Sequence, residues 1–168
     1  MTSKHPANIS VLISEDAIQE RVRKLGEEIS NLYAGRTLCV IGVLKGSFVF
    51  MADLIRAIQL PVVCEFIGIS SYGDATESSG VVQITSDLSS SIEGKDVLIV
   101  EDIIETGITL QYLLANLATR QPKSIRICAL LSKPGKARAQ VPVDFVGFEI
   151  PGAFVVGYGL DYAGLHRD

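Results

Sequence analysis

Apolar positions in the first part of the chain follow the spacing of an α-helix. They recur at alternating steps of four and three, which places them on one face: Ile18, Val22, Leu25, Ile29 and Leu32. Ser14 is a suitable N-cap, and Glu15 and Asp16 bring negative charge to the first turn, where the helix dipole favours it. We therefore predict a helix that begins after Ser14 and ends before Gly35.

Beyond Gly35 the pattern changes to short apolar runs separated by helical segments. Continuous apolar runs are typical of strands covered on both faces, as in a parallel sheet. The pattern predicts helices at residues 48–58 and 110–117, and strands at residues 37–43, 62–69, 81–84, 97–100, 125–131 and 143–148. Strands that alternate with helices imply βαβ units, and therefore an α/β fold with a doubly wound, mainly parallel sheet.

The chain has no visible linker or internal repeat, so we expect one domain over residues 1–168. Serine is concentrated in residues 70–91. We expect about 70–80 to form a mobile loop that joins a short ribbon.

Composition and charge narrow the classes of protein. Hydrophobic residues make up 48% and charged residues 20% of the chain, which excludes intrinsic disorder. The net charge of −4 argues against a protein held mainly by nucleic-acid phosphates. No apolar run approaches the roughly 18 residues that a membrane span requires. We therefore expect neither a nucleic-acid partner nor a membrane.

The cysteines and histidines indicate the compartment. Cys39, Cys64 and Cys128 each lie in an apolar stretch, and we interpret them as three buried thiols in a reducing environment. His5 and His166 lie near opposite ends of the chain, so a structural zinc site is not expected. The first residues lack the apolar segment of a signal peptide, and we expect a cytoplasmic protein.

Candidate chemistry is concentrated at residues 97–110. An apolar strand ends in Glu101 and Asp102, and a turn containing Thr106, Gly107 and Thr109 leads into a helix. Ligands of open α/β sheets bind at the carboxyl ends of strands, and a helix start offers unpaired N–H groups to phosphate. The carboxylates, on opposite sides of an extended backbone, suit sugar hydroxyls, magnesium or both. For the carboxylate pair alone, a plain turn with solvated acids is the alternative interpretation.

The same stretch resembles the diphosphate-sugar signature of the type I phosphoribosyltransferases. Further segments resemble the hypoxanthine-guanine phosphoribosyltransferases in their order and spacing, with Arg167-Asp168 behind them: residues 44–47, 70–73, 77–80, 130–133, 143–151 and 154–162. The resemblance runs from about Leu38 to the end of the chain. It implies the type I phosphoribosyltransferase fold, with a small hood built largely from the C-terminal part and a flexible loop at the active site.

The implied reaction transfers a phosphoribosyl group from 5-phosphoribosyl-1-diphosphate to hypoxanthine or guanine, giving IMP or GMP and pyrophosphate. The resemblance implies that Mg²⁺ is required, with Glu101, Asp102 and Asp161 as its ligands. It also implies a Leu44–Lys45 peptide that can be cis. The residues implied to bind phosphoribosyl diphosphate are Leu44, Lys45, Gly46, Ser71, Tyr72, Glu101, Asp102, Ile103, Ile104, Glu105, Thr106, Gly107, Ile108, Thr109 and Arg167.

The residues implied to bind the purine lie in the second half of the chain. Phe154 would stack on the base, and Val155 would offer backbone groups to its edge. Asp161, counted with them, would bind the second magnesium ion through water. Lys133 would donate to the exocyclic O6, which adenine lacks.

One residue departs from the family pattern. Glu105 stands where the family usually has aspartate, at the position assigned to proton transfer at purine N7. Glutamate keeps the carboxylate but adds one methylene. We hypothesise that Glu105 is the general base; the alternative is a weakened, solvent-assisted proton step.

Two other functions fit the same resemblance. One is a xanthine-guanine phosphoribosyltransferase, and the other is a non-catalytic regulator that senses nucleotides. The Phe-Val-Val-Gly-Tyr run favours the hypoxanthine-guanine group, and the set of Lys133, Phe154 and Asp161 favours catalysis. Because relatives form dimers or tetramers, we expect a homodimer or homotetramer; residues 48–51 would supply either an interface or a buried helix.

Overall fold

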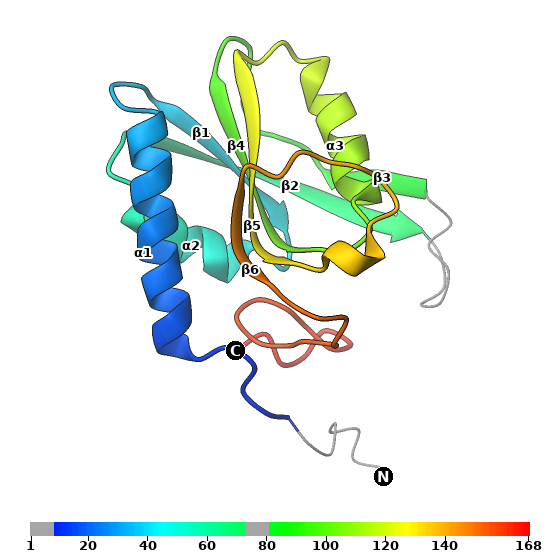
Figure 1. The fold of residues 1–168 in the computed structure, drawn as a ribbon. Coiled ribbons are helices and arrows are strands. Elements are labelled where there is room, and N and C mark those ends of the chain that lie inside the picture. The colour runs from blue at the N-terminus through cyan, green and yellow to red at the C-terminus, as the bar shows by residue number, and fades with distance from the viewer. Residues whose placement is uncertain (1–8, 73–80) are drawn as a thin grey trace.

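The computed structural model describes residues 9–72 and 81–168, so most of the predicted loop at about 70–80 lies outside the described residues. Helices flank a six-stranded sheet (Figure 1), which confirms the predicted α/β fold. The helices are α1 (Glu15–Leu32), α2 (Phe48–Ala57) and α3 (Ile108–Ala118), with the 3₁₀ helix η1 (Pro134–Lys136). The strands are β1 (Leu38–Leu44), β2 (Val62–Tyr72), β3 (Val81–Ser86), β4 (Asp96–Ile104), β5 (Ser124–Ser132) and β6 (Phe145–Glu149).

The strands are arranged in the order β3-β2-β1-β4-β5-β6. Every neighbouring pair is parallel except β2 and β3, which pair in antiparallel fashion. The five parallel strands therefore end at one edge of the sheet. This edge is where an open α/β sheet binds its ligands.

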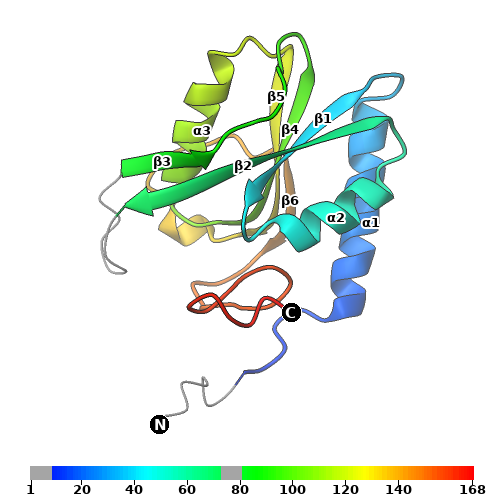
Figure 2. The same ribbon diagram turned by 180° about the vertical axis from the view of Figure 1, so that it is seen from behind.

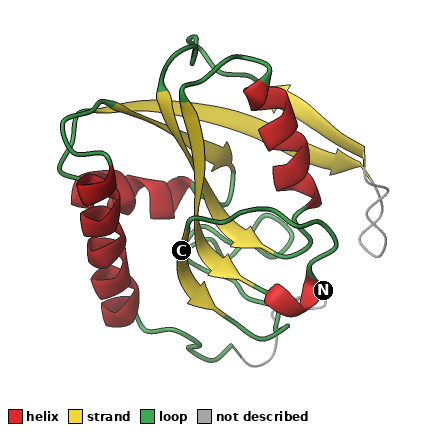
Figure 3. Ribbon diagram, turned by 45° about the horizontal axis from the view of Figure 1, so that its top comes forward, coloured by secondary structure: helices red, strands yellow, loops and turns green. Residues whose placement is uncertain are grey.

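Helices cover both faces of the sheet. Helices α1 and α2 lie on one face and α3 lies on the other (Figures 2 and 3). Leu98 and Val100 of β4 belong to the core under α1 and α2, whereas Ile99 belongs to the core under α3. Residues 38–43 of β1 are all buried, because this strand is covered on both faces, as its continuous apolar run predicts.

The ends of the elements follow from local hydrogen bonds. The Ala17 N–H donates to Ser14 Oγ at 3.3 Å, which confirms Ser14 as the N-cap of α1. Strand β6 begins at Phe145, two residues later than predicted. Just before it, Asp144 binds Ile127 of β5 twice: its N–H donates to the Ile127 carbonyl at 3.1 Å, and its carboxylate accepts the Ile127 N–H at 2.9 Å.

Residues 151–168 form the hood, a looped segment that follows β6 beyond the carboxyl edge of the sheet (Figure 1). Two isolated bridges, between Gly157 and Leu160 and between Tyr162 and Leu165, close its turns. The C-terminal hood is therefore confirmed.

The prediction of three buried thiols is wrong for one of them. Cys39 and Cys128 are buried, whereas Cys64 is exposed. Cys64 lies on β2, next to the edge strand of the sheet, where the neighbouring Phe66 is also 44% exposed. The helices cover the middle of the sheet and leave this part open. None of the helices in the described residues is long and apolar enough to cross a membrane.

Candidate active site

The carboxyl ends of β1, β4 and β5 bring three predicted segments to one edge. Lys45 and Gly46 follow β1, Glu105 follows β4, and Lys133 follows β5. Lys133 N–H donates to the Ile104 carbonyl at 2.9 Å, which continues the β4–β5 pairing to the site itself. Parallel pairing therefore aligns residues that are far apart in sequence.

Asp102 lies directly against the loop that follows β1. A Cβ built on Gly46 would come within 1.6 Å of Asp102 Oδ2, so only glycine permits this approach. The Asp102 Oδ1 atom accepts the Ile103 N–H at 2.8 Å. The Leu44–Lys45 peptide bond is cis, as the resemblance implies for this loop.

The Glu101 carboxylate is buried but available to bind a ligand. It is 7% exposed, and no donor among the described residues forms a hydrogen bond to it. Burial, and secondarily the neighbouring Asp102, raise its pKa well above the ordinary value. Burial also raises the pKa of Asp102. A cation or a hydroxyl donor would relieve the cost of placing these two groups together.

The turn between β4 and α3 has the form of an anion site. Gly107 has φ +78°, and a Cβ there would lie 2.8 Å from the Ala139 carbonyl oxygen. The Thr106 carbonyl accepts the N–H groups of Arg138 and Ala139 at 3.0 and 2.9 Å, which fixes the turn from behind. The N-cap of helix α3, Gly107, has no side chain to cap it, and the Ile108 N–H donates to Thr106 Oγ1 at 3.5 Å, so the N–H groups that follow in the first turn are left for an anion.

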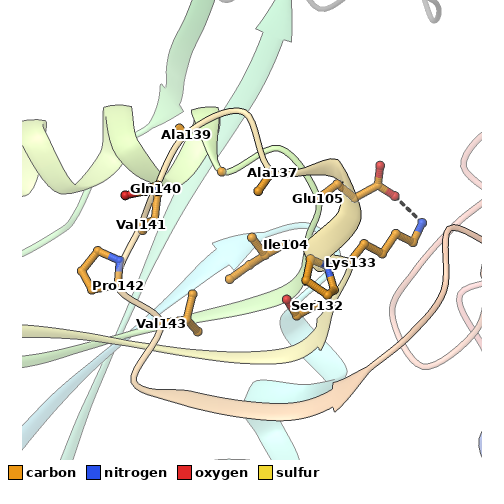
Figure 4. Close-up of a pocket in the computed structure, with 12 residues that line it drawn as sticks. Ile104, Glu105, Ser132, Lys133, Ala137, Ala139, Gln140, Val141, Pro142 and Val143 are labelled. Carbon is orange, nitrogen blue, oxygen red and sulfur yellow. Dashed lines mark hydrogen bonds and ion pairs between the residues drawn. The ribbon is translucent and has the colours of Figure 1, made fainter.

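Glu105 and Lys133 form an ion pair at the carboxyl ends of β4 and β5 (Figure 4). Lys133 is buried, whereas the Glu105 side chain is 39% exposed. The Lys133 ammonium group, and then Lys136 at 3.7 Å from Oε2, lower the pKa of Glu105. Glu105 is therefore ionised at neutral pH, which a general base requires.

The pair lies at the rim of an open cavity of about 600 Å³, whose walls come from the ends of β4 and β5, from Gly107 and from the segment between Pro134 and Val143. Figure 4 shows that the Glu105 and Lys133 side chains point away from its interior, toward which Ile104, Val141 and Val143 are directed.

The predicted purine residues do not all share one cavity. Phe154 and Val155 line a second cavity of about 620 Å³ between the hood, the start of α1 and the ends of β5 and β6, and Lys133 is not among its walls. Phe154 is 71% exposed and contacts Tyr162 edge to face, with ring centroids 5.8 Å apart. The structure thus joins Lys133 to Glu105, and Phe154 to Val155, as two separate groups.

Arg167 and Asp161, predicted for pyrophosphate and metal, contact one another. Arg167 Nη2 lies 2.8 Å from Asp161 Oδ1, and Arg167 Nη1 donates to the Gly159 carbonyl. Asp161 Oδ2 also accepts the Gly164 N–H at 2.6 Å. Of the predicted loop residues, Ser71 and Tyr72 are the last two residues of β2. The structure describes their backbone but not their side chains.

Sequence reasoning missed two contributors to this region. Lys136 is the second cation beside Glu105. Tyr158 of the hood donates its hydroxyl hydrogen to Asp53 of α2 at 2.6 Å. The available signals were the only acidic residue of a mainly apolar helix, Asp53, and a tyrosine between two glycines, Gly157 and Gly159.

Comparisons with known proteins agree with this geometry. The family model described as "Phosphoribosyl transferase domain" matches residues 13–163. A hypoxanthine-guanine phosphoribosyltransferase of Mycobacterium avium is 51% identical over 98% of this chain and 84% of its own length. One from Bacillus subtilis is 52% identical over 94% of this chain and 88% of its own.

A solved structure extends the likeness to three dimensions. The crystal structure of a hypoxanthine phosphoribosyltransferase from Staphylococcus aureus has a TM-score of 0.91 and 47% identity, and the match covers 95% of this chain and 86% of that one. Identity at this level over nearly the whole chain, together with the phosphoribosyl transferase domain, leaves one conclusion. The chain belongs to the hypoxanthine-guanine phosphoribosyltransferase family of the type I phosphoribosyltransferases.

Proposed function

We propose that this protein is a purine-salvage enzyme, organised as a single domain. It transfers the 5-phosphoribosyl group of 5-phosphoribosyl-1-diphosphate to hypoxanthine or guanine and releases pyrophosphate. The observation that carries this proposal is the convergence, at one sheet edge, of the Lys45–Gly46 loop, the Glu101–Asp102 pair and the open helix start after Gly107. Diphosphate, ribose and 5-phosphate each have a matching group there.

Each part of phosphoribosyl diphosphate is bound by a different group at this edge. The N–H groups and hydroxyls of residues 105–109 bind the dianionic 5-phosphate, because a helix start favours negative charge. Glu101 and Asp102 bind the ribose hydroxyls, which donate to the carboxylates. Lys45 and Gly46 bind the diphosphate, and Arg167 meets the leaving pyrophosphate by exchanging its contact with Asp161. Holding both reactants in place removes much of the entropic barrier.

Magnesium fits the residues at this edge. Mg²⁺ is bound in many enzymes by one or two carboxylates, with substrate phosphates completing its shell, and Glu101 and Asp102 provide that pair with raised pKa values. When bound, the ion neutralises the developing charge of the diphosphate. No group of three or more metal-binding side chains forms among the described residues, so the proposed ion depends on substrate oxygens for the rest of its shell. Asp161, in the hood, is proposed for a second ion.

The purine is recognised at O6 and N7. Lys133 donates to O6, while the Glu105 carboxylate accepts the proton that leaves N7 as N9 bonds to C1 of the ribose. Phe154 stacks on the base and Val155 offers its backbone edge. Support for this division comes from the buried Lys133 beside an ionised Glu105. Adenine carries an amino donor at the position where Lys133 needs an acceptor, and this mismatch disfavours the binding of adenine.

Initial rates with hypoxanthine, guanine, xanthine and adenine test the proposal, with pyrophosphate release as the readout. Turnover with hypoxanthine and guanine and none with adenine is expected. Preferred use of xanthine over hypoxanthine would favour the xanthine-guanine alternative. Absence of pyrophosphate with every base would favour the nucleotide-sensing alternative.

A homodimer or homotetramer, acting in the cytoplasm on small molecules without nucleic-acid partners, is part of this proposal. Phe48 of α2 and Phe66 of β2 are 45% and 44% exposed, and large exposed apolar side chains of this kind support an interface between copies. Analytical ultracentrifugation tests the assembly, and a monomer at micromolar concentration would contradict it.

A further inference from the structure

The hood is tied to α2 by a hydrogen bond that the reaction scheme above does not use. The Tyr158 hydroxyl donates to Asp53 Oδ2 at 2.6 Å. We propose that Asp53 is a positioning residue that acts through Tyr158: it holds the hood against the Lys45–Gly46 loop and thereby sets the affinity for phosphoribosyl diphosphate. The inference rests on the proposed function, because it assigns the diphosphate to that loop.

The backbone at Tyr158 indicates that its side chain is held in place. Tyr158 has φ +51°, between Gly157 at +89° and Gly159 at +102°. Residues other than glycine seldom adopt a positive φ, so surrounding contacts have to maintain this backbone conformation. The Tyr158 side chain packs against the core on the α1/α2 face and ends at the Asp53 carboxylate. Packing and hydrogen bond together hold Tyr158 in place, in the wall of the cavity that also contains Phe154 and Val155.

The next residue of the hood touches the diphosphate loop. A Cβ on Gly159 would lie 2.1 Å from the Gly46 carbonyl oxygen, so the two backbones are in direct contact. Gly159 also binds Arg167 in both directions: its N–H donates to the Arg167 carbonyl at 2.8 Å, and its carbonyl accepts from the guanidinium. A shift of Tyr158 would therefore move Gly46 and Arg167 relative to one another.

One helix supports both sides of this contact. Helix α2 begins directly after Gly46 and the buried Ser47, whose hydroxyl donates to the Val43 carbonyl at 2.7 Å. Asp53 lies further along the same helix and also accepts a hydrogen bond from Gln19 of α1 at 3.4 Å. The loop and the hood are thus fixed to one rigid element, at its start and through Asp53.

The experiment compares wild type with Tyr158→Phe, Asp53→Ala and Asp53→Asn in steady-state kinetics, corrected for the folded fraction. Tyr158→Phe and Asp53→Ala are expected to raise the KM for phosphoribosyl diphosphate about tenfold while kcat changes by less than about threefold. Asp53→Asn keeps an acceptor oxygen and should remain within about threefold of wild type in both constants. The Tyr158→Phe/Asp53→Ala double variant should be no worse than the worse single variant, because both remove the same bond.

Arg56→Ala is the matched control. Arg56 Nη1 lies 3.6 Å from Asp53 Oδ1, but its side chain is 82% exposed to solvent, so wild-type constants are expected. A lower melting temperature with an unchanged KM in Tyr158→Phe would overturn the positioning role, since the bond would then serve stability alone. If Asp53→Ala does not fold, Tyr158→Phe decides, because it keeps the ring. A wild-type protein that makes no nucleotide would instead refute the proposed function itself.

Discussion

Lys133 and Glu105 form an ion pair across the ends of β5 and β4, although 28 positions separate them in the chain. A buried ammonium group is thereby compensated by a carboxylate that is more than a third exposed. In the proposed reaction the purine enters between these partners: O6 takes the ammonium group, and Glu105 becomes available to N7. The pair therefore links base recognition to proton transfer.

Glu105→Gln should reduce kcat at least tenfold and leave the KM for phosphoribosyl diphosphate close to that of wild type. The amide cannot accept the N7 proton, and general base catalysis contributes about 10²–10⁴-fold. Steady-state kinetics with hypoxanthine measures both constants. An unchanged kcat would remove Glu105 from the mechanism and support a solvent-assisted proton step.

Lys133→Met should raise the KM for hypoxanthine by about tenfold or more, because the purine O6 would lose its donor and an unsatisfied buried polar group costs about 1–3 kcal/mol. The KM for phosphoribosyl diphosphate should change little. Kinetics with each substrate varied in turn separates the two constants. Equal increases in both would indicate that Lys133 supports the site as a whole.

Tyr162→Ala should raise the KM for the purine, whereas Tyr162→Phe should not. The Tyr162 ring meets Phe154 edge to face at an interplanar angle of 88°, and such pairs contribute about 0.5–1.5 kcal/mol. A loss of that size corresponds to a KM change of about two- to tenfold, measured with hypoxanthine or guanine. If Tyr162→Ala has the wild-type KM, Phe154 does not need this contact to stack on the base.

Glu65→Gln should lower the free energy of unfolding by about 1–3 kcal/mol at pH 7. The buried Glu65 carboxylate accepts hydrogen bonds from Ser90 Oγ and from the N–H and Oγ of Ser89, at 3.0 and 2.9 Å for the latter two. Ser90, followed by Ser89, lowers its pKa in the folded state.

The sign of the pH dependence follows from that lowered pKa. The contribution of Glu65 is complete above the pKa of the unfolded chain, near 4.5, and is lost as the pH falls through the folded value. Urea unfolding at several pH values should therefore show the gap between wild type and Glu65→Gln narrowing in acid. Glu93→Gln, at an exposed position, is the control and should match wild type. A gap that stays constant to pH 3 would mean that the charge of Glu65 is unimportant.

Thiol reagents should modify Cys64 first in the native protein. Cys64 is exposed, whereas burial raises the pKa of both Cys39 and Cys128. Mass spectrometry after a short exposure to iodoacetamide identifies the labelled residue, and Cys64→Ser should remove the fast phase. Rapid labelling of Cys39 or Cys128 would mean that the sheet opens locally.

The sequence by itself determined the elements and their order. Helical spacing in α1, continuous apolar runs in β1, β4 and β5, and the Gly107 turn are local patterns, and they depend on backbone geometry and on which face is covered. Because ligands of open α/β sheets bind where parallel strands end, the same patterns also predicted that Glu101 and Asp102 would lie at the ligand edge, whereas Lys133 was named only through the resemblance. Their chemical roles came from the resemblance of ordered motifs.

Tertiary structure decided the contacts between distant segments. The Tyr158–Asp53 bond joins positions 105 residues apart, and the exposure of Cys64 depends on where the helices stop covering β2. No periodicity encodes either feature, because each results from the packing of several elements at once. The pattern of side chains therefore fixed which segments become helix or strand, whereas the fit of those segments against one another fixed the partners of Glu105, Asp53 and Arg167.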